Sequence, residues 1–524
     1  MNTGFLAPLT GSMPVRRLAD AAVVRLAHRR ALALDRMDAA AVQDATLRRL
    51  VRHAAGTRFG RDHHFHSIRT VADYQRRVPV RDYDDFWALY WKGAYPRLAG
   101  TTWPEVIPYY ALSSGTTSGT TKYIPISRQM VRSNQTAAFT TTALFRHAHP
   151  RAELFTGKFF FLGGSTDLRK QEDGSLAGDL SGIATKEVAE ALRPYSFPPL
   201  DLALLGDWEK KLPLLAERAA REPITAVSGV PSWVKILFDQ VKATTGKRTI
   251  ADVWPMLRLV VVGGTKFDPY RELFRAEVGD AVDFCEVYPA SEGFIATEDP
   301  RHHLLRLIPD IGLFFEFIPA GEFVDGKPPA NPTRHTLREV QVGVQYAVVL
   351  TTCAGLWGYL LGDTVTFESV RPPLLRFSGR TKFFLSAFGE HLIQEEVDRA
   401  VARAAAACGV AAVDHHVGPV FPTATEKAGR HLYLVEFAGP SPDLGRFATL
   451  IDAELSRLNE DYAAHRGGDL TMMAPEVRAV PAGGFAAWMA ARGKAGGQNK
   501  VPRIDNSGAV TAQLADWLRS RRPE

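Results

Sequence analysis

The chain has few cysteines, no long apolar run and little excess charge. Its three cysteines, Cys285, Cys353 and Cys408, lie far apart and form no C-x-x-C pair, which argues against a disulfide framework and favours free thiols in a reducing compartment. No apolar stretch approaches the roughly 20 residues that a membrane-spanning helix needs. The formal net charge of +6 over 524 residues is too small an excess to indicate nucleic-acid binding. We therefore expect a cytoplasmic protein without nucleic-acid or membrane partners.

The N-terminal segment is basic but lacks the features of a targeting sequence. Asp20 and Asp35 interrupt its basic face, and no hydrophobic signal core or cleavage site follows. A membrane-surface helix is the alternative, but the pattern favours a helix packed on the protein surface. The basic residues are Arg16, Arg17, Arg25, Arg29 and Arg30.

One loop, at residues 113–122, combines two glycines, seven hydroxyl side chains and a terminal lysine without any acidic residue. Such a loop offers backbone N–H groups, neutral hydrogen-bond donors and one cation, which are the groups that bind a polyphosphate. Its spacing is not that of G-x-x-x-x-G-K-[ST]. A flexible linker is the alternative, but aromatic and apolar segments flank the loop closely on both sides. The composition therefore favours a phosphate-binding loop.

Several segments downstream repeat one design, in which an apolar strand ends in glycine and a helical pattern follows. The strands are expected at residues 159–164, 224–231 and 257–264, with helices at 233–241 and 270–278. Such repeats are typical of a parallel or mixed sheet covered by helices, with ligands at the carboxyl ends of the strands. Residues 1–100 are mainly helical in pattern, with a break at 56–60. The fold class is therefore predicted to be α/β.

From about residue 313 the pattern is rich in strands, expected at 314–318, 340–350 and 365–368. A domain boundary is predicted within residues 377–382. The remainder resembles an α+β unit, with helices at 395–408 and 443–458 and a strand at 432–437. We therefore expect a large N-terminal domain of mixed and parallel sheets, 1–379, and a small mobile C-terminal domain, 380–524.

The phosphate loop and two later motifs resemble, in order, those of the auxin-responsive acyl-acid amido synthetases (the Gretchen Hagen 3 family) and their bacterial relatives, within the adenylate-forming enzymes. Residues 288–293 resemble the family's aromatic-x-x-Ser-Glu motif, and 358–363 resemble its Tyr-x-x-Gly-Asp motif. The resemblance implies ATP and Mg²⁺ as cofactors. It implies that the phosphates contact the loop residues Ser114, Gly115, Thr116, Thr117, Ser118 and Gly119, with charge stabilisation from Lys122.

The resemblance also implies the adenine, metal and ribose contacts. Adenine would lie against Gly263, Gly264 and Thr265 and stack on Tyr288, beside Ser291. Glu292 would hold Mg²⁺, although a solvated surface acid is the simpler alternative. Asp363, expected at a turn between two strands, would accept hydrogen bonds from the ribose hydroxyls unless it only forms an Asx turn. The family has an arginine where this chain has Gly358.

Two further cations complete the implied catalytic set. Arg380 resembles the arginine before the interdomain hinge, which reaches ribose and phosphate. Lys500 resembles the mobile C-terminal lysine that approaches the α-phosphate, with Lys494 as the alternative. Lys500, Lys122 and Arg380 are therefore the predicted catalytic residues.

The implied reaction has two steps: a carboxylic acid is adenylated by ATP, and its acyl group is then transferred to an amine, most simply that of an amino acid, with release of AMP. Thiol capture, as in acyl-CoA ligases, and a non-catalytic ATP-binding regulator are the alternatives. The paired histidines at 63–64, 302–303 and 415–416 show no metal-ligand spacing and are interpreted as surface or core residues. The sequence does not indicate the acid or the oligomeric state.

Overall fold

The structure is a computed structural model that describes most of the chain. The described residues are 13–114, 121–163, 168–203, 205, 208–264, 267–324, 326–381, 384–385, 390, 392–420, 429–459, 462–463, 466, 472–493, 501–505 and 507–520.

The N-terminal hundred residues are mainly helical, as predicted. The break predicted at 56–60 is shorter than expected: only its first two residues lie between the helices α3 and α4, because α4 already begins at Arg58. Thr57 begins the second of these by accepting a hydrogen bond from the Gly60 N–H, a standard N-cap. The basic N-terminal helix is packed, because Ala27, Ala31 and Leu34 are buried. The helices are α2 (Met13–Arg36), α3 (Ala39–Ala54), α4 (Arg58–Asp62), α5 (Val71–Arg77) and α6 (Tyr83–Phe86).

The predicted α/β class is confirmed by a sheet of eleven strands within the described residues, in the order β12-β13-β14-β15-β11-β10-β9-β8-β7-β3-β6. Neighbours run parallel from β9 to β6 and antiparallel from β12 to β9. Its strands are β3 (Lys158–Phe161), β6 (Ser196–Phe197), β7 (Ile224–Gly229), β8 (Leu259–Gly263), β9 (Asp283–Ala290), β10 (Gly293–Asp299), β11 (Leu304–Leu307), β12 (Leu313–Pro319), β13 (Gln345–Thr352), β14 (Tyr359–Val370) and β15 (Pro373–Arg380).

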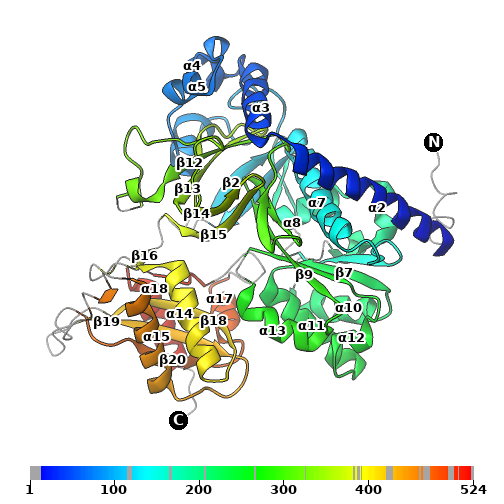
Figure 1. Ribbon diagram of the computed structural model, residues 1–524, viewed down its shortest axis with the longest axis vertical. Helices are drawn as coiled ribbons and strands as arrows, with labels where there is room; N and C mark the ends of the chain where they lie inside the picture. The colour runs from blue at the N-terminus through cyan, green and yellow to red at the C-terminus, as the bar shows by residue number, and fades with distance from the viewer. Residues whose placement is uncertain are drawn as a thin grey trace.

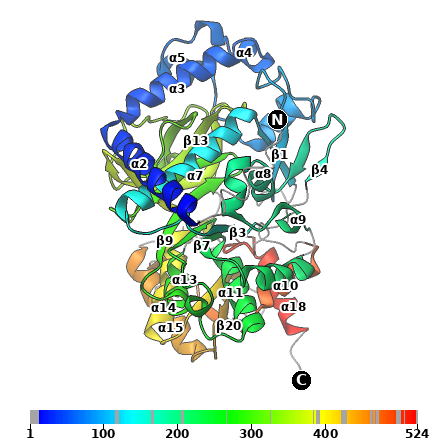
Figure 2. The same cartoon turned by 90° about the vertical axis from the view of Figure 1, so that its right-hand side faces the viewer.

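Helices cover both faces of the parallel strands. Alternate residues of these strands point to opposite faces of the sheet, so each face packs in its own core. Val227 and Val260 pack in one core with residues of α11 and α13, whereas Leu259 and Cys285 pack in another with Phe145 of α7. Figures 1 and 2 show α2 and α7 on one side of β7 and β9, with α10 to α13 on the other. The covering helices are α7 (Arg128–Ala148), α10 (Trp208–Ala219), α11 (Pro231–Thr245), α12 (Ile250–Val253) and α13 (Asp268–Val278).

The phosphate loop belongs to a second, smaller sheet with the order β2-β1-β5-β4. β1 and β5 run parallel, so the residue after β5, Asp179, lies at the same end of the sheet as the phosphate loop. The strands are β1 (Tyr109–Ser114), β2 (Thr121–Ile126), β4 (Arg169–Lys170) and β5 (Leu176–Gly178), and two short helices follow, α8 (Leu180–Lys186) and α9 (Leu200–Ala203).

The C-terminal part of the chain forms a separate α+β unit, at the lower left of Figure 1. Both of its hydrophobic cores consist of described residues from Leu385 onward, whereas the buried residues of the two largest cores of the preceding part lie at or before Leu375. One half-buried residue of the unit, Val413, packs against the second of these cores. Its elements are β16 (Phe384–Leu385), β17 (Leu392–Ile393), α14 (Gln394–Ala407), β18 (Ala412–Val420), β19 (Arg430–Phe437), α15 (Leu444–Leu458), β20 (Glu476–Val480), α17 (Gly484–Ala491) and α18 (Ala509–Arg519).

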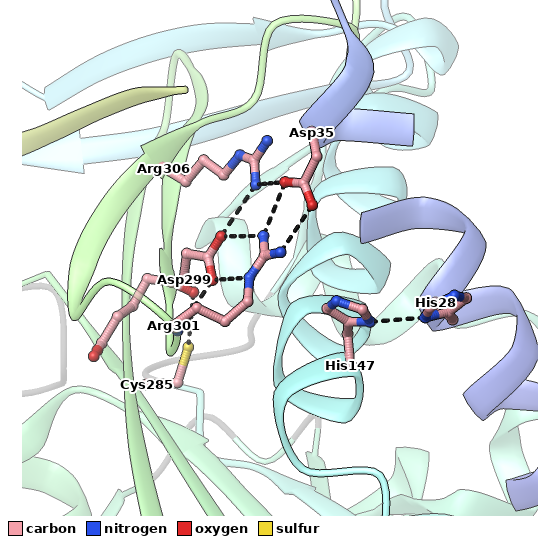
Figure 3. A network of polar contacts seen from close by, with 8 residues as sticks. His28, Asp35, His147, Cys285, Asp299, Arg301 and Arg306 are labelled. Atoms are coloured by element: carbon pink, nitrogen blue, oxygen red, sulfur yellow. Dashed lines mark hydrogen bonds and ion pairs between the residues drawn. The ribbon is translucent and has the colours of Figure 1, made fainter. Parts of the chain in front are cut away.

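A network of charges, in which Arg306 and Asp299 are buried and Arg301 and Asp35 are partly exposed, fastens α2 to the large sheet (Figure 3). Arg306, of β11, donates to Asp35 at 2.6 Å and to Asp299 at 3.1 Å. Arg301 bridges the same two carboxylates. These arginines hold the pKa of both carboxyls below the usual range, and for Asp299 they do so against its burial. The network therefore stabilises the docking of the N-terminal helix.

Replacing Arg306 by alanine is expected to lower the free energy of unfolding by about 3 kcal/mol, because a buried carboxylate, Asp299, loses one of its two partners. Urea unfolding checks this value. Arg338→Ala is the matched control, since it removes a half-exposed ion pair with Asp44 and should cost much less stability. Equal losses in the two variants would contradict a stabilising role of the network.

Candidate active site

Asp363 and Arg380 face each other across two neighbouring strands. The register of β14 and β15 pairs these two residues, and the Arg380 Nε–H donates to Asp363 Oδ1 at 2.6 Å. The expectation that Asp363 lies at a turn between strands is wrong. Gly362, at φ +86°, is a local irregularity within β14, and the strand continues through it. The Asx-turn alternative for Asp363 fails for the same reason.

Tyr288 holds the other oxygen of Asp363. Its hydroxyl donates to Asp363 Oδ2 at 2.8 Å, and its ring packs edge-on against Phe377. Burial, and then the Asp363 charge, raise the pKa of Tyr288 well above its ordinary value, so the hydroxyl stays protonated and donates. The Asp363 charge raises the pKa of Arg380 in turn. These three residues therefore form a charged cluster in which a buried carboxylate is held by a buried tyrosine and a half-buried arginine.

A second carboxylate, Glu292, lies in the two-residue turn between β9 and β10. Ala290 and Gly293 are paired across this turn. Glu292 is 7% exposed, so it is not the solvated surface acid of the alternative interpretation. The Tyr359 hydroxyl donates to its Oε1 at 2.9 Å. Burial raises the pKa of Glu292, and the Lys122 charge opposes this shift, which places the lysine near the carboxylate.

Glu292 is suited to a single-carboxylate magnesium contact. Among the described residues, no cluster of three or more acidic, histidine or cysteine side chains is arranged to hold a metal ion. A magnesium ion that carries nucleotide phosphates typically takes only one or two carboxylates from the protein. Burial of the Glu292 carboxylate disfavours its charged form and raises its pKa, and a bound cation would favour the charged form. The residues present therefore fit a phosphate-bound Mg²⁺.

The phosphate loop joins the two strands of a hairpin. β1 pairs with β2, with Ser113 opposite Lys122 and Ser114 opposite Thr121. An interdomain linker is excluded for this loop because its two ends are hydrogen-bonded to each other. Lys122 lies 5.6 Å from the centre of the Tyr83 ring, close to the loop end. The predicted loop residues Gly115, Thr116, Thr117, Ser118 and Gly119 lie outside the described residues.

Gly263 is the last residue of β8 and approaches β9 closely. A Cβ built at this position would lie 2.8 Å from Val287 Cγ2 and 2.9 Å from the Val287 carbonyl oxygen, so a larger residue would separate the two strands. Gly264 follows at φ +81°, which favours glycine. Packing of the sheet thus accounts for Gly263, and the adenine contact of this turn stays a prediction. Thr265 lies outside the described residues.

The glycine that replaces the family's arginine, Gly358, has a backbone that disfavours a side chain. Its φ is +57°, and a Cβ would lie 3.1 Å from the Pro79 carbonyl oxygen and 3.3 Å from an Arg334 nitrogen. A side chain at this position would start against Pro79 and Arg334. Arg81 is joined to this strand start by two backbone hydrogen bonds, to Gly358 and Leu360. The local backbone thus accounts for the glycine.

The C-terminal candidates Lys494 and Lys500 lie outside the described residues, but the segment after Lys500 is anchored to the C-terminal unit. Val501 is buried in its core. The Val417 N–H donates to the Arg503 carbonyl at 2.8 Å, and the Asp505 N–H donates to the Val417 carbonyl at 2.9 Å. His416 also bonds to the Pro502 carbonyl and to the Thr511 hydroxyl. Residues 501–505 are therefore fixed to the C-terminal unit.

Stability of the C-terminal unit is expected to fall as the pH is lowered below about 6.5. Burial lowers the pKa of His416 from 6.5, so the unfolded chain binds a proton more readily than the folded chain. The sign follows from linkage: stability rises with pH where the unfolded state holds more protons, by at most about 1.4 kcal/mol per pH unit for one group.

Urea unfolding of the wild type and of His416→Asn at about pH 8 and about pH 5.5 measures this contribution. The wild type should lose more stability on acidification than the variant does. An equal loss would show that His416 does not control this pH dependence. His415, Asp414 and Asp505 also act electrostatically on His416, and they remain in both proteins.

Tyr359 is the one residue of this cluster that was not among the predicted site residues. Its hydroxyl donates to Glu292 from β14, four residues before Asp363 on the same strand. Its signal was present in the sequence, since it is the tyrosine of the Tyr-x-x-Gly-Asp motif. Ser291 occupies the turn beside Glu292, and its contact with nucleotide stays a prediction.

The fold and this cluster together define a large α/β domain with a separate C-terminal unit, and the cluster lies where β9, β10, β14 and β15 meet. Family models match three parts of the chain: the GH3 family N-terminal domain at residues 29–214, its central domain at 306–380 and its C-terminal domain at 395–509. The chain belongs to the GH3 family, as the three motifs indicated.

Curated relatives and a solved structure agree with this assignment. Jasmonoyl-L-amino acid synthetase JAR4 of Nicotiana attenuata is 23% identical in an alignment 438 residues long, which covers 70% of this chain and 74% of the relative. Indole-3-acetic acid-amido synthetase GH3.8 of Oryza sativa subsp. indica is 28% identical in an alignment 353 residues long, which covers 60% of this chain and 56% of the relative. The structure of GH3.15 acyl acid amido synthetase has the same fold, with a TM-score of 0.75 at 18% identity over 92% of this chain and 94% of that chain.

In the described part of the chain, no helix combines the length and apolar character needed to cross a membrane.

Proposed function

We propose that this chain joins a carboxylic acid to an amine in two steps, with ATP as the activating substrate. The acid is first converted to an acyl-adenylate with release of pyrophosphate, and the acyl group then passes to the amine with release of AMP. One observation supports this most directly. Two buried carboxylates, Glu292 and Asp363, lie with the cations Lys122 and Arg380 beside a glycine- and hydroxyl-rich hairpin loop.

Adenylation needs cations beside the reacting phosphate. A carboxylate is a poor acylating agent, and its attack on the α-phosphate of ATP concentrates negative charge in the transition state. The proposed phosphate contacts are the loop N–H and hydroxyl groups together with Lys122. Glu292 would hold a Mg²⁺ ion, which neutralises phosphate charge when bound. The buried Tyr359 hydroxyl donates to the Glu292 carboxylate and so helps to orient it.

Asp363 is proposed to hold the ribose. An ionised carboxylate offers about four lone-pair positions, and Arg380 and Tyr288 take one on each oxygen. The remaining positions are free to accept two ribose hydroxyls, while the two donors fix the carboxylate in place. Arg380 would also contribute positive charge toward the phosphates. Gly264, Thr265, Tyr288 and Ser291 are proposed to line the adenine position.

The C-terminal unit is proposed to move between the two steps. We divide the chain at 379/380 into a large N-terminal domain and a small C-terminal domain, with a hinge just after Arg380, the last residue of β15. Thr381 still donates its N–H to the Gly362 carbonyl, so movement would begin beyond it. In the adenylation arrangement Lys500 would approach the α-phosphate, and rotation would remove it before the acceptor enters.

An amino acid is the proposed acceptor, because the relatives are named as synthetases that conjugate acids to amino acids. The acid substrate is proposed only as a chemical class, that of small organic carboxylic acids. The cytoplasm is the proposed location, since all three cysteines are free and thus compatible with a reducing compartment.

Two assays on the purified chain test the proposal. Exchange of pyrophosphate into ATP should depend on an added acid, and a panel of aliphatic and aromatic acids identifies the substrate class. Mass spectrometry of reactions with an amino acid mixture or with coenzyme A then identifies the acceptor. Amides with AMP release support the proposal. Thioesters alone would make the chain an acyl-CoA-type ligase, and ATP binding without exchange for any acid would make it a regulator.

A further inference from the structure

The side chain of Lys122 has an aromatic ring as its neighbour. Its Nζ lies 5.6 Å from the centre of the Tyr83 ring, which is within the range of a cation–π contact. Among the described residues, no side-chain hydrogen bond or ion pair holds this ammonium group. A lysine has a long, flexible stem, so the Tyr83 ring is the contact that limits where the charge can lie.

Tyr83 also fixes the backbone next to the lysine. Its hydroxyl accepts a hydrogen bond from the Tyr123 N–H at 2.9 Å, and Tyr123 follows Lys122 directly in β2. Tyr83 is 5% exposed, and burial raises its pKa to about 12, so the phenol stays neutral. The rings of Trp87 and Trp91 lie 6.0 and 5.8 Å from that of Tyr83. One buried residue therefore contacts both the side chain of the lysine and the strand that carries it.

The segment that contains Tyr83, residues 81–86, also contacts the tyrosine that holds Glu292. Arg81 is bridged to Tyr359 by backbone hydrogen bonds with the two neighbours of this tyrosine. The ring of Phe86, which is fully buried, lies 6.1 Å from the Tyr359 ring. The Tyr359 hydroxyl in turn donates to Glu292. Residues 81–86 therefore connect the lysine of the hairpin with the carboxylate of the β9–β10 turn.

The segment 81–86 is fixed internally as well. α6 begins with a capping box, in which the Asp85 N–H donates to Asp82 and the Asp82 N–H donates to Asp85, at 3.2 and 3.3 Å. Such a reciprocal cap satisfies two backbone donors at the start of a helix. A segment held in this way can keep two groups at its ends in a constant relation.

From these contacts we propose that Tyr83 positions Lys122 for the adenylation step, and that residues 81–86 keep this lysine in register with the Glu292 carboxylate. The inference rests on the proposed function, in which both groups act on the phosphates of one nucleotide. Charged groups stabilise a transition state only when they are held close to the productive geometry. Tyr83 acts through Lys122 and not on the substrate itself.

A double-mutant cycle in the pyrophosphate-exchange assay tests this role. Tyr83→Leu should lower kcat/KM for ATP by about tenfold, because the ring contact and the hydrogen bond to the backbone are both lost. Lys122→Met should lower it by about 10²-fold. The double variant should be no slower than Lys122→Met, since a residue that acts through the lysine has no effect without it. Tyr83→Phe keeps the ring and should stay within about threefold of the wild type.

Tyr195→Leu is the matched control for the loss of a buried tyrosine. Tyr195 is 7% exposed, and the Arg16 guanidinium lies 5.0 Å from the centre of its ring, but it has no contact with the candidate site. This variant should unfold at a lower urea concentration while its folded fraction keeps near-normal exchange. If Tyr83→Leu does not fold, Tyr83→Phe completes the same cycle, with about threefold as the expected loss.

Two results of the cycle would overturn the proposal. An equal loss from Tyr83→Leu with and without Lys122 would show that the ring only supports the fold. Wild-type exchange by a folded Tyr83→Leu protein would show that the lysine does not need the ring.

Calorimetric titration of the same four proteins with ATP and Mg²⁺ separates this inference from the proposed function. A wild type that binds ATP but shows no exchange with any acid would contradict the proposed reaction. The positioning role would still hold if Tyr83→Leu weakened ATP binding only in the presence of Lys122. Absence of ATP binding to the wild type would overturn both.

Discussion

Replacing Asp363 by alanine is expected to reduce acid-dependent pyrophosphate exchange by about 10²-fold or more, the scale for one charged contact in a reacting site. The variant loses the proposed ribose acceptor and also the negative charge that holds Arg380 and the Tyr288 hydroxyl in place. Most of the loss should fall on kcat/KM for ATP, because both effects weaken the nucleotide complex and its transition state. Steady-state exchange kinetics at varied ATP concentration measure it.

The control must separate lost chemistry from lost folding, since Asp363 is 6% exposed. Glu316→Ala removes a comparable buried carboxylate, paired with Arg334 outside the site. It should lower stability to a similar extent while the folded fraction keeps near-normal exchange. Tyr288→Phe removes a single donor to Asp363 and should cost about tenfold at most. A folded Asp363→Ala protein with wild-type exchange would remove Asp363 from the site.

Local patterns predicted the parallel half of the large sheet well. The strands β3, β7 and β8 and the helices α11 and α13 occur where an apolar run, a glycine and a helical pattern follow one another. Prediction was weaker in the antiparallel half. β14 starts at Tyr359, six residues before the expected strand, because Gly358 and Gly362 resemble turn residues. In the parallel half, one covering helix, α10, was not predicted. It contains Pro213, a residue that usually argues against a helix.

The candidate site shows the same division between local and distant information. The motifs singled out Glu292, Tyr288 and Asp363, because each motif is a short stretch around one turn or strand, although the turn expected at Asp363 is part of β14. The contacts between them join residues that are distant in sequence, such as Tyr288 with Asp363 and Tyr359 with Glu292. These contacts depend on strand order and register, and a one-residue slip in the pairing of β14 and β15 would turn Asp363 to the opposite face. No single-sequence pattern specifies that register.

Replacing Lys500 by alanine is expected to slow acyl-adenylate formation by about 10²-fold or more and to leave the second step nearly unchanged. The structure adds a reason to expect this separation. Val501 to Asp505 are fixed to β18 and to the core of the C-terminal unit, so Lys500 would travel with that unit when it rotates. A lysine carried away between steps can serve only the first of them.

Two rapid-mixing assays measure the steps separately. The first follows pyrophosphate release from ATP and acid, and the second supplies preformed acyl-adenylate and follows amide formation. Lys494→Ala is the matched control, because it removes a lysine six residues earlier in the same glycine-rich segment; both steps should stay close to normal. Equal slowing of both steps by Lys500→Ala would indicate a fixed catalytic lysine, and the moving-domain mechanism would then be wrong. Slowing of the first step by Lys494→Ala alone would assign the mobile lysine to position 494.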